Sequence, residues 1–148
     1  MKIINYSEQT ETDKAHWREE IQKADWGAAK YLYTLLNENR LIEMCGQSEV
    51  LLVTDEHKLV SFCTLAEQDE VIDENMKPWI GFVYTFEEHR GNRYSQKLID
   101  YCCELARKAK CKNVYISSDH IGLYEKYGFV FIKHTTTVWG ENQGNRMK

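Results

Sequence analysis

Two arginines, Arg90 and Arg93, stand beside Gly91 at the expected start of a helix. A helix N-terminus carries a partial positive charge and several N–H groups without internal partners, so acidic residues are expected there. Two cations at that end are unfavourable unless an anion fills the site, and free amides with two guanidinium groups suit a phosphate. The alternative is that Glu87 and Glu88 neutralise the arginines and the segment is only a turn.

The turn joins a predicted strand to a predicted helix. Residues 79–86 follow Pro78 and are rich in aromatic and β-branched side chains, which predicts a strand. From Tyr94 to Ala109, apolar residues recur at three- and four-residue steps and charged residues occupy the other face. This pattern predicts an amphipathic helix, so the segment as a whole is a strand, a glycine-bearing turn and a helix.

The first 37 residues predict one strand and two helices. Residues 2–6 suit a short strand, and residues 11–25 suit a helix with Thr10 or Thr12 as its N-cap. Residues 26–37 suit a second helix.

Three aromatic residues of the second helix, Trp26, Tyr31 and Tyr33, are more than a packing helix needs. They either line a pocket for an organic substrate or pack in the core or on the surface, and packing is the more common role.

A hairpin and an acidic connection lead to the strand before the turn. Residues 49–54 and 59–66 have the composition of strands, and the four residues 55–58 between them predict a hairpin. Residues 67–76 are acidic and predict a solvated loop. The alternative is a rim that attracts a cationic substrate.

The last third of the chain predicts further strands. Residues 113–117 follow the central helix, and a right-handed crossover would pair them in parallel with the strand before the turn. Residues 119–127 predict a short helix with Gly128 as its C-terminal cap, and residues 129–134 another strand. Residues 142–148 are either a polar tail or a last strand.

Length and composition indicate one mixed α/β domain over residues 1–148, with an antiparallel N-terminal part. The chain has 148 residues and 43% apolar side chains, which suits one domain with a core of its own. No apolar run reaches the roughly 18 residues of a membrane span, and the N-terminus lacks the apolar stretch of a signal peptide. We therefore expect a cytoplasmic protein without a membrane partner.

Charge is unevenly spread along the chain. Residues 1–76 hold 16 acidic and 7 basic residues, and residues 77–148 hold 7 acidic and 12 basic residues. A basic second half suits an anionic ligand near the turn, and an acidic first half suits a cationic second partner, unless surface charges fell this way by chance. No strongly basic face is visible, which disfavours nucleic acid as a ligand.

Cysteines and histidines give no metal or disulfide pattern. The five cysteines are odd in number and none are spaced as Cys-x-x-Cys, which favours free thiols, and the five histidines are scattered. We therefore expect no metal cofactor.

Two separate segments match one family. Residues 85–95 resemble motif A of the GNAT N-acetyltransferases. Residues 123–129 look like motif B, with its Tyr-Glu-Lys-x-Gly-Phe core. The resemblance covers residues 50–132 well and the first helices only by order. It implies the GNAT fold: a central, mixed, mostly antiparallel twisted sheet flanked by helices, with a V-shaped splay between its two central parallel strands.

The turn departs from the family pattern, which is Gln/Arg-x-x-Gly-x-Gly/Ala. Arg90 holds the first position, but Arg93 and Ser95 stand where small residues are usual. A side chain at Arg93 requires an ordinary helical φ or enough room beside the ligand. Ser117 stands where the family often carries an asparagine, seven residues before the motif B tyrosine.

The resemblance implies that acetyl-CoA binds this chain. The pyrophosphate would lie on the backbone amides of the turn, and the pantetheine would run as a pseudo-strand beside the preceding strand. The residues that this assigns to the cofactor are Val83, Tyr84, Thr85, Arg90, Gly91, Asn92, Arg93, Tyr94, Ser95 and Ser117.

Tyr124 matches the family position of the general acid that protonates the leaving thiolate; without the resemblance it would be a packed aromatic. Tyr127 is the competing phenol and is interpreted as a core residue. Family members often have a glutamate that acts as the general base on the motif A strand. Trp79 stands at that position here, so a carboxylate base is absent there. The remaining candidates, acting through water, are Glu67, Glu70, Asp73 and His120.

The resemblance implies an N-acetyltransferase that acts by direct attack of a primary amine on acetyl-CoA. The amine would belong to a small cationic molecule, such as a polyamine or an aminoglycoside-like amine, or to a protein. One alternative is a non-catalytic acyl-CoA binding or sensing module on the same fold. Another is a phosphate-binding module unrelated to coenzyme A. Edge strands and the C-terminal segment allow a homodimer.

Overall fold

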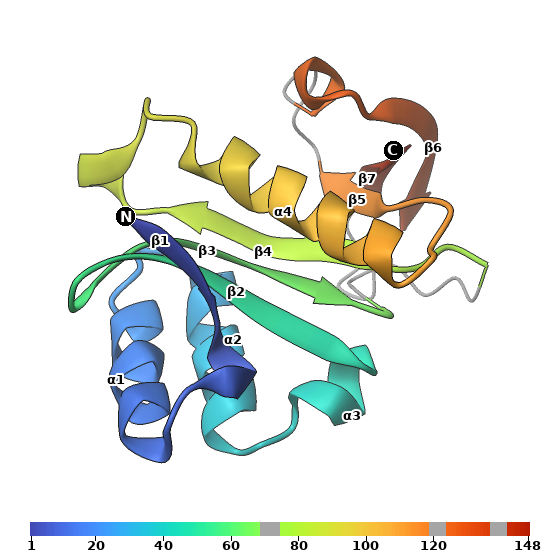
Figure 1. The fold of residues 1–148 in the computed structure, drawn as a ribbon. Coiled ribbons are helices and arrows are strands. Elements are labelled where there is room, and N and C mark those ends of the chain that lie inside the picture. Colours follow the sequence, from blue (N-terminus) through green and yellow to red (C-terminus); the bar gives the residue numbers. More distant parts are fainter. Residues whose placement is uncertain (69–74, 119–123, 137–141) are drawn as a thin grey trace.

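One seven-stranded sheet runs through the protein in the order β1-β2-β3-β4-β5-β7-β6 (Figure 1). The structure is a computed structural model, and it describes residues 1–68, 75–118, 124–136 and 142–148. The strands are β1 Lys2–Asn5, β2 Ser48–Asp55, β3 Lys58–Ala66, β4 Trp79–Thr85, β5 Tyr115–Ser118, β6 Val130–Thr136 and β7 Asn142–Met147.

Helices cover both faces of the sheet. Helices α1 (Glu11–Gln22) and α2 (Gly27–Asn37) lie on one face, and α4 (Tyr94–Lys108) lies on the other (Figure 1). The shorter elements are α3 Leu41–Cys45 and the 3₁₀ turns η1 Tyr6–Glu8, η2 Glu87–His89 and η3 Glu125–Tyr127.

All described strand pairs are antiparallel except β4 with β5, which pair in parallel. Helix α4 is the connection between these two strands, so the predicted strand–helix–strand unit is confirmed. Strand β7 pairs with both β5 and β6, so the last segment is inserted into the sheet and is not a polar tail.

Among the described residues, the core has one large apolar cluster on each face of the sheet and a small third cluster of Met76, Trp79 and Tyr115. In β2, Val50 and Leu52 belong to the cluster under α1 and α2, whereas Leu51 and Val53 belong to the cluster under α4. A strand buried on both faces needs apolar side chains at every position, which explains the uninterrupted apolar run in the sequence.

Several predicted boundaries differ from the structure. The first helix ends at Gln22 and not at residue 25. Asp55 pairs with Lys58, so the hairpin turn has two residues and not four. Helix α3 was not predicted, because a single turn that buries only Leu41 and Cys45 shows no readable period.

Two predicted segments fall partly outside the described residues. Of the predicted helix at 119–127, the described part is η3, and Gly128 follows it with φ 93° as the predicted cap. Most of the acidic connection also lies outside the described residues.

The five cysteines are free thiols. Cys63 on β3 and Cys102 on α4 bring their sulfur atoms to 3.5 Å, and both are fully buried. The hydrogen bond with Cys63, together with burial, raises the pKa of the Cys102 thiol well above its ordinary value. The Cys102 thiol is therefore neutral at neutral pH, and both buried sulfur atoms serve as packing groups.

In the described part of the chain, no helix has both the length and the apolar character needed to cross a membrane. The same residues contain no group of three or more His, Cys, Asp or Glu side chains arranged to hold a metal ion.

The N-cap of α1 gives a matched test of the fold. The Thr10 hydroxyl accepts the Asp13 N–H at 3.1 Å, so Thr10, and not Thr12, is the cap. We expect Thr10→Ala to lower the free energy of unfolding by about 1 kcal/mol, measured by urea denaturation. Thr12→Ala changes an exposed residue two positions further along the chain and should change the free energy of unfolding by less than about 0.5 kcal/mol. Equal effects would contradict the assignment.

Candidate active site

Strand β4 loses its β5 partner after its first two residues. Its parallel pairing with β5 is limited to Trp79 with Tyr115 and Ile80 with Ile116. The strand then continues to Thr85 without a partner on that side among the described residues. In Figure 1, β5, β7 and β6 turn away from β4 beyond this point. This is the V-shaped splay that the resemblance implies.

A β-bulge lies where the strand becomes unpaired. Phe62 pairs with Tyr84 and Thr64 with Gly81, so β4 holds one more residue than β3 between these pairs. Phe82 has φ 51°, an uncommon value for a residue with a side chain. The extra residue shifts the alternation, so that after the bulge a different set of main-chain groups faces the open side.

Beyond the bulge, β4 presents main-chain polar groups to the side that β5 leaves open. The Phe86 N–H donates to the Val60 carbonyl at 3.0 Å, which turns Phe86 toward β3. In an antiparallel pair, residues alternate between facing the partner strand and facing away from it. The carbonyl of Val83 and the N–H of Thr85 therefore point to the open side.

Tyr84 faces the other way. The Ser61 hydroxyl donates to its carbonyl at 2.7 Å, and its ring packs against the cluster under α1 and α2. Three β4 residues were predicted to bind the cofactor. Val83 and Thr85 have main-chain groups on the open side, whereas the main-chain N–H and carbonyl of Tyr84 are directed to β3.

The predicted phosphate turn leaves the N-terminus of α4 uncapped. Arg93 is the N-cap residue and makes no side-chain capping bond, and no acidic residue lies in the first turn. Tyr94 and Ser95 are the first two residues of the helix, where N–H groups lack internal partners. Among the described residues, neither Arg90 nor Arg93 forms an ion pair with the two preceding glutamates. The turn therefore has the free amides and unpaired cations that suit a bound anion.

The backbone of the turn is left-handed at two positions. Gly91 has φ 85°, and Arg93 has φ 62° and ψ 30°. An ordinary helical φ at Arg93, one of the two conditions expected from the sequence, is wrong, because the arginine adopts the conformation that glycine takes without strain. The Asn92 side chain donates to the His89 carbonyl at 2.9 Å and to the Arg90 carbonyl at 3.4 Å, which ties the turn together.

Tyr124 stands at the start of η3 and is 8% exposed. Its ring lies edge-on to Tyr127 and Phe129, at centroid distances of 6.2 and 6.3 Å. It belongs to the apolar cluster under α4, and Val83 and Tyr94 pack against this same cluster. The structure thus brings the predicted acid, the predicted pantetheine strand and the predicted phosphate turn to one face of the sheet. Tyr127 is half-buried in the same cluster.

Ser117 has a buried hydroxyl oxygen with no hydrogen-bond partner among the described residues. It lies on β5, which borders the open side of β4, and pairs with Asn145 on β7. Buried hydroxyl groups in folded proteins nearly always have a partner. A ligand in the splay would supply one, so Ser117 fits its predicted place in a cofactor site.

The sequence reasoning missed an ion pair that holds the turn of Tyr124. Arg146 on β7 is 3% exposed, and its Nε donates to Glu125 Oε1 at 2.6 Å. Glu125 directly follows Tyr124, so this pair fixes η3 to the inserted strand. A lone arginine in a polar C-terminal segment gives no sequence signal of such a role.

The candidate bases remain largely unplaced. Trp79, which stands where family members often have a glutamate, is fully buried, and its ring N–H donates to the Met76 carbonyl. Glu67 is exposed. Glu70, Asp73 and His120 lie outside the described residues.

On the opposite face of β4, aromatic rings gather beside the unpaired segment. Trp26 at the start of α2 stacks on Tyr84, with centroids 5.7 Å apart and planes at 12°, and meets Phe82 edge-on at 6.4 Å. Trp26, Tyr31 and Tyr33 are each half-buried, so they pack against the core and also keep exposed ring surface.

Solved acyltransferase structures share this fold. One is an aminoglycoside 6'-N-acetyltransferase complexed with coenzyme A (12% identity, TM-score 0.69, 99% of this chain and 94% of that chain). Another is an acyl-CoA N-acyltransferase from Pseudomonas aeruginosa (18% identity, TM-score 0.68, 99% and 97%). A third is the aminoglycoside 6'-N-acetyltransferase from Enterococcus faecium (12% identity, TM-score 0.69, 99% and 94%). At these identities the likeness shows the fold.

The sequence itself identifies the family. The family model of the acetyltransferase (GNAT) family matches residues 7–129. The chain belongs to the GNAT acetyltransferase family. No curated protein sequence matches it at a significant level.

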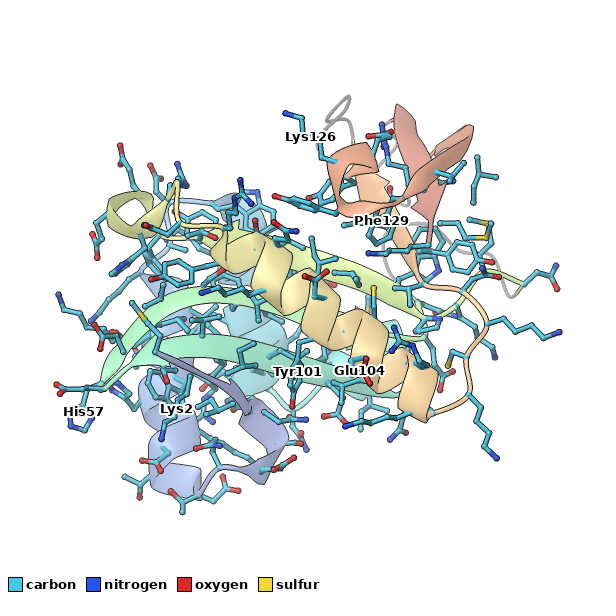
Figure 2. All side chains as sticks on the ribbon, turned by 45° about the horizontal axis from the view of Figure 1, so that its top comes forward. Lys2, His57, Tyr101, Glu104, Lys126 and Phe129 are labelled. Atoms are coloured by element: carbon cyan, nitrogen blue, oxygen red, sulfur yellow. The ribbon has the colours of Figure 1, made fainter. Side chains whose placement is uncertain are left out.

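The Glu125–Arg146 pair predicts a large stability effect from a small change. Glu125→Gln removes the charge opposite the buried guanidinium of Arg146, and we expect it to lower the free energy of unfolding by about 2–3 kcal/mol in urea denaturation. This value lies below that of a fully buried pair because Glu125 is half-buried. Lys126→Gln is the control, since Lys126 points outward from the same turn (Figure 2) and should change stability by less than about 0.5 kcal/mol. A Glu125→Gln protein as stable as the control would contradict this role.

Proposed function

We propose that this protein is an N-acetyltransferase that transfers the acetyl group of acetyl-CoA to a primary amine. The observation that carries the proposal is that the unpaired edge of β4 leads, through η2 and a short turn, into the uncapped N-terminus of α4. An extended polar chain that ends in a diphosphate matches this sequence of groups, because the edge offers strand pairing and the helix offers amides for an anion.

The chain would hold acetyl-CoA in two parts. The carbonyl of Val83 and the N–H of Thr85 would pair with the pantetheine arm, and the Ser117 hydroxyl would contribute a hydrogen bond from β5. The amides from Gly91 to Ser95 would bind the pyrophosphate. The GNAT family and a solved neighbour complexed with coenzyme A support this choice of ligand.

The residues of the site would lower the barrier in two ways. When bound, acetyl-CoA supplies the thioester that the amine attacks. A main-chain N–H in the segment from Val83 to Thr85 would stabilise the negative charge that develops on the carbonyl oxygen. The Tyr124 hydroxyl would give a proton to the departing sulfur, which we expect to accelerate the reaction about 10²–10⁴-fold.

The acceptor must reach the reaction centre as a neutral amine. A lysine-type amine has a pKa near 10.4, so its deprotonation at neutral pH costs about 4–5 kcal/mol. A base acting through water or desolvation would offset part of that cost. We propose that the acceptor approaches from the face of Trp26 and Tyr84, because α4 occupies the other face.

The acceptor is proposed to be a cationic amine of a small molecule or a protein. Aromatic faces attract cations, and the first half of the chain carries a net negative charge. Two solved neighbours are aminoglycoside 6'-N-acetyltransferases, which act on amines of this kind. The homodimer, the cytoplasmic location and the absence of nucleic acid and membrane partners stay predictions.

A second candidate is a non-catalytic acyl-CoA binding module. The burial of Trp79 favours it, because a fully buried indole cannot serve as the base that family members often have at this position. Both candidate functions require binding of acyl-CoA, but only the first includes transfer of the acyl group to an amine.

A charge placed at the helix N-terminus tests the ligand. Ser95→Glu puts a carboxylate where the pyrophosphate would lie, yet favours the helix by about 0.3–1 kcal/mol through its dipole. We expect calorimetric titration to show micromolar acetyl-CoA affinity in the wild type, much weaker ADP binding, and at least about a tenfold loss in Ser95→Glu, since two anions would compete for one site.

The neutral variant Ser95→Gln, similar in size to the glutamate, separates charge from bulk and should lose less affinity. A Ser95→Glu protein that binds like the wild type would remove the pyrophosphate from this turn. A wild type that binds ADP as tightly as acetyl-CoA would leave only a generic phosphate site.

The phenol of Tyr124 tests turnover. With a panel of amines and detection of released thiol, we expect Tyr124→Phe to lower kcat about 10²-fold or more, with acetyl-CoA affinity within about threefold of the wild type. Tyr127→Phe is the matched control and should keep kcat. Acetyl-CoA binding without thiol release for any amine in the wild type would favour the non-catalytic module.

A further inference from the structure

The Arg90 side chain folds back onto β4. Its Nε donates to the Thr85 carbonyl at 2.8 Å, and its guanidinium carbon lies 5.4 Å from the centroid of the Tyr84 ring. Arg90 is exposed, so this arrangement is not forced by burial. Arg93, three residues further on, makes no such contact among the described residues. The two arginines of the turn therefore have different surroundings.

Tyr84 is a fixed platform for this contact. Its ring stacks on Trp26 at 5.7 Å and on Phe62 at 5.6 Å, and it meets Phe86 edge-on at 5.3 Å. Its carbonyl is bonded by Ser61. A ring packed by Trp26, Phe62 and Phe86 cannot move freely, so a guanidinium that lies over it is held in a fixed position relative to the sheet.

The Arg90–Thr85 bond ends the open edge of β4. The Thr85 carbonyl is the last main-chain acceptor of the strand, and Arg90 occupies it. Beyond this point the chain enters η2 and then the turn before α4. One guanidinium therefore joins the two parts of the proposed acetyl-CoA site, the β4 edge and the amides of the turn.

We propose that Arg90 is a positioning residue that sets the separation between the β4 edge and the N-terminus of α4. This inference rests on the proposed function, because it concerns a ligand that contacts both parts at once. A ligand that spans two contact regions gains from both only when their separation matches its own length. A fragment that touches only the turn is indifferent to that separation.

Lysine cannot replace arginine in this role. The contact needs a planar group that lies over a ring and an N–H that reaches a carbonyl at the same time, and an ammonium group is a point charge without a plane. A charge that merely attracted phosphate would be retained in lysine. The Arg90→Lys substitution therefore separates positioning from simple electrostatic attraction.

The experiment compares two ligands by calorimetric titration at one ionic strength. Acetyl-CoA spans both regions, whereas 3'-phosphoadenosine 5'-diphosphate has the adenosine and the phosphates without the pantetheine arm. We expect Arg90→Lys to weaken acetyl-CoA about tenfold, in line with the loss of a charge-assisted hydrogen bond and a cation–π contact, and to change the affinity for the phosphate fragment less than about twofold. Tyr84→Leu removes the ring but not the charge of Arg90, and it should likewise weaken acetyl-CoA binding and leave binding of the phosphate fragment nearly unchanged.

Arg93→Lys is the matched comparison in the same turn, and we expect it to weaken both ligands by at most about threefold, since the charge stays. Equal weakening of both ligands in Arg90→Lys would make Arg90 a phosphate contact and overturn the proposal. Unchanged affinity for both ligands would overturn it as well.

A readout without ligand keeps this test separate from that of the proposed function. In proton–nitrogen NMR spectra of the free protein, the Arg90 Nε–H should exchange slowly and show a ring-current shift that disappears in Tyr84→Leu. If that signal is present but the wild type does not bind acetyl-CoA, the proposed function fails and the contact stands. If the Nε–H exchanges as fast as that of Arg93, the proposal fails whether or not acetyl-CoA binds.

Discussion

The early end of the pairing between β4 and β5 is the constraint on which the rest of the site depends. Two residue pairs join these parallel strands, and the bulge at Phe82 begins where the pairing stops. An unpaired strand edge inside a sheet exposes main-chain groups that would otherwise be bonded, and such groups need partners. The loss is tolerated because β5 is bonded along its other side to β7, so the splay opens one edge without loosening either strand.

Because of the same constraint, the two faces of β4 beside the open edge carry different kinds of side chains. Alternation along β4 directs Val83 to the cluster under α4, together with Tyr124 and the start of that helix, and directs Phe82 and Tyr84 to the aromatic rings under α2. One face therefore carries the start of α4 with its free amides, and the other carries aromatic ring surface, on which the Arg90 guanidinium lies. A reaction between an anionic donor and an amine acceptor needs two such different approaches to one strand.

The sequence predicts this arrangement wherever the signal is local. Apolar periodicity places α4 within a residue of its observed end, and Gly128 marks the end of η3. The features that were missed depend on contacts distant in sequence. The insertion of β7 between β5 and β6 is invisible in a polar segment, and the Arg146–Glu125 pair joins residues 21 positions apart. The bulge at Phe82 leaves no composition signal, because a phenylalanine at positive φ reads like any strand residue.

Arg93 departs from the family pattern and still adopts a backbone conformation that suits glycine. The pattern has glycine at this position, and the observed φ of 62° and ψ of 30° are values that glycine adopts freely. A side chain there costs about 1–2 kcal/mol relative to a right-handed conformation. The fold tolerates that strain, since Gly91 and the Asn92 side chain hold the turn from the preceding residues. The substitution therefore adds an exposed cation beside unpaired amides, and this increases the attraction of the turn for an anion.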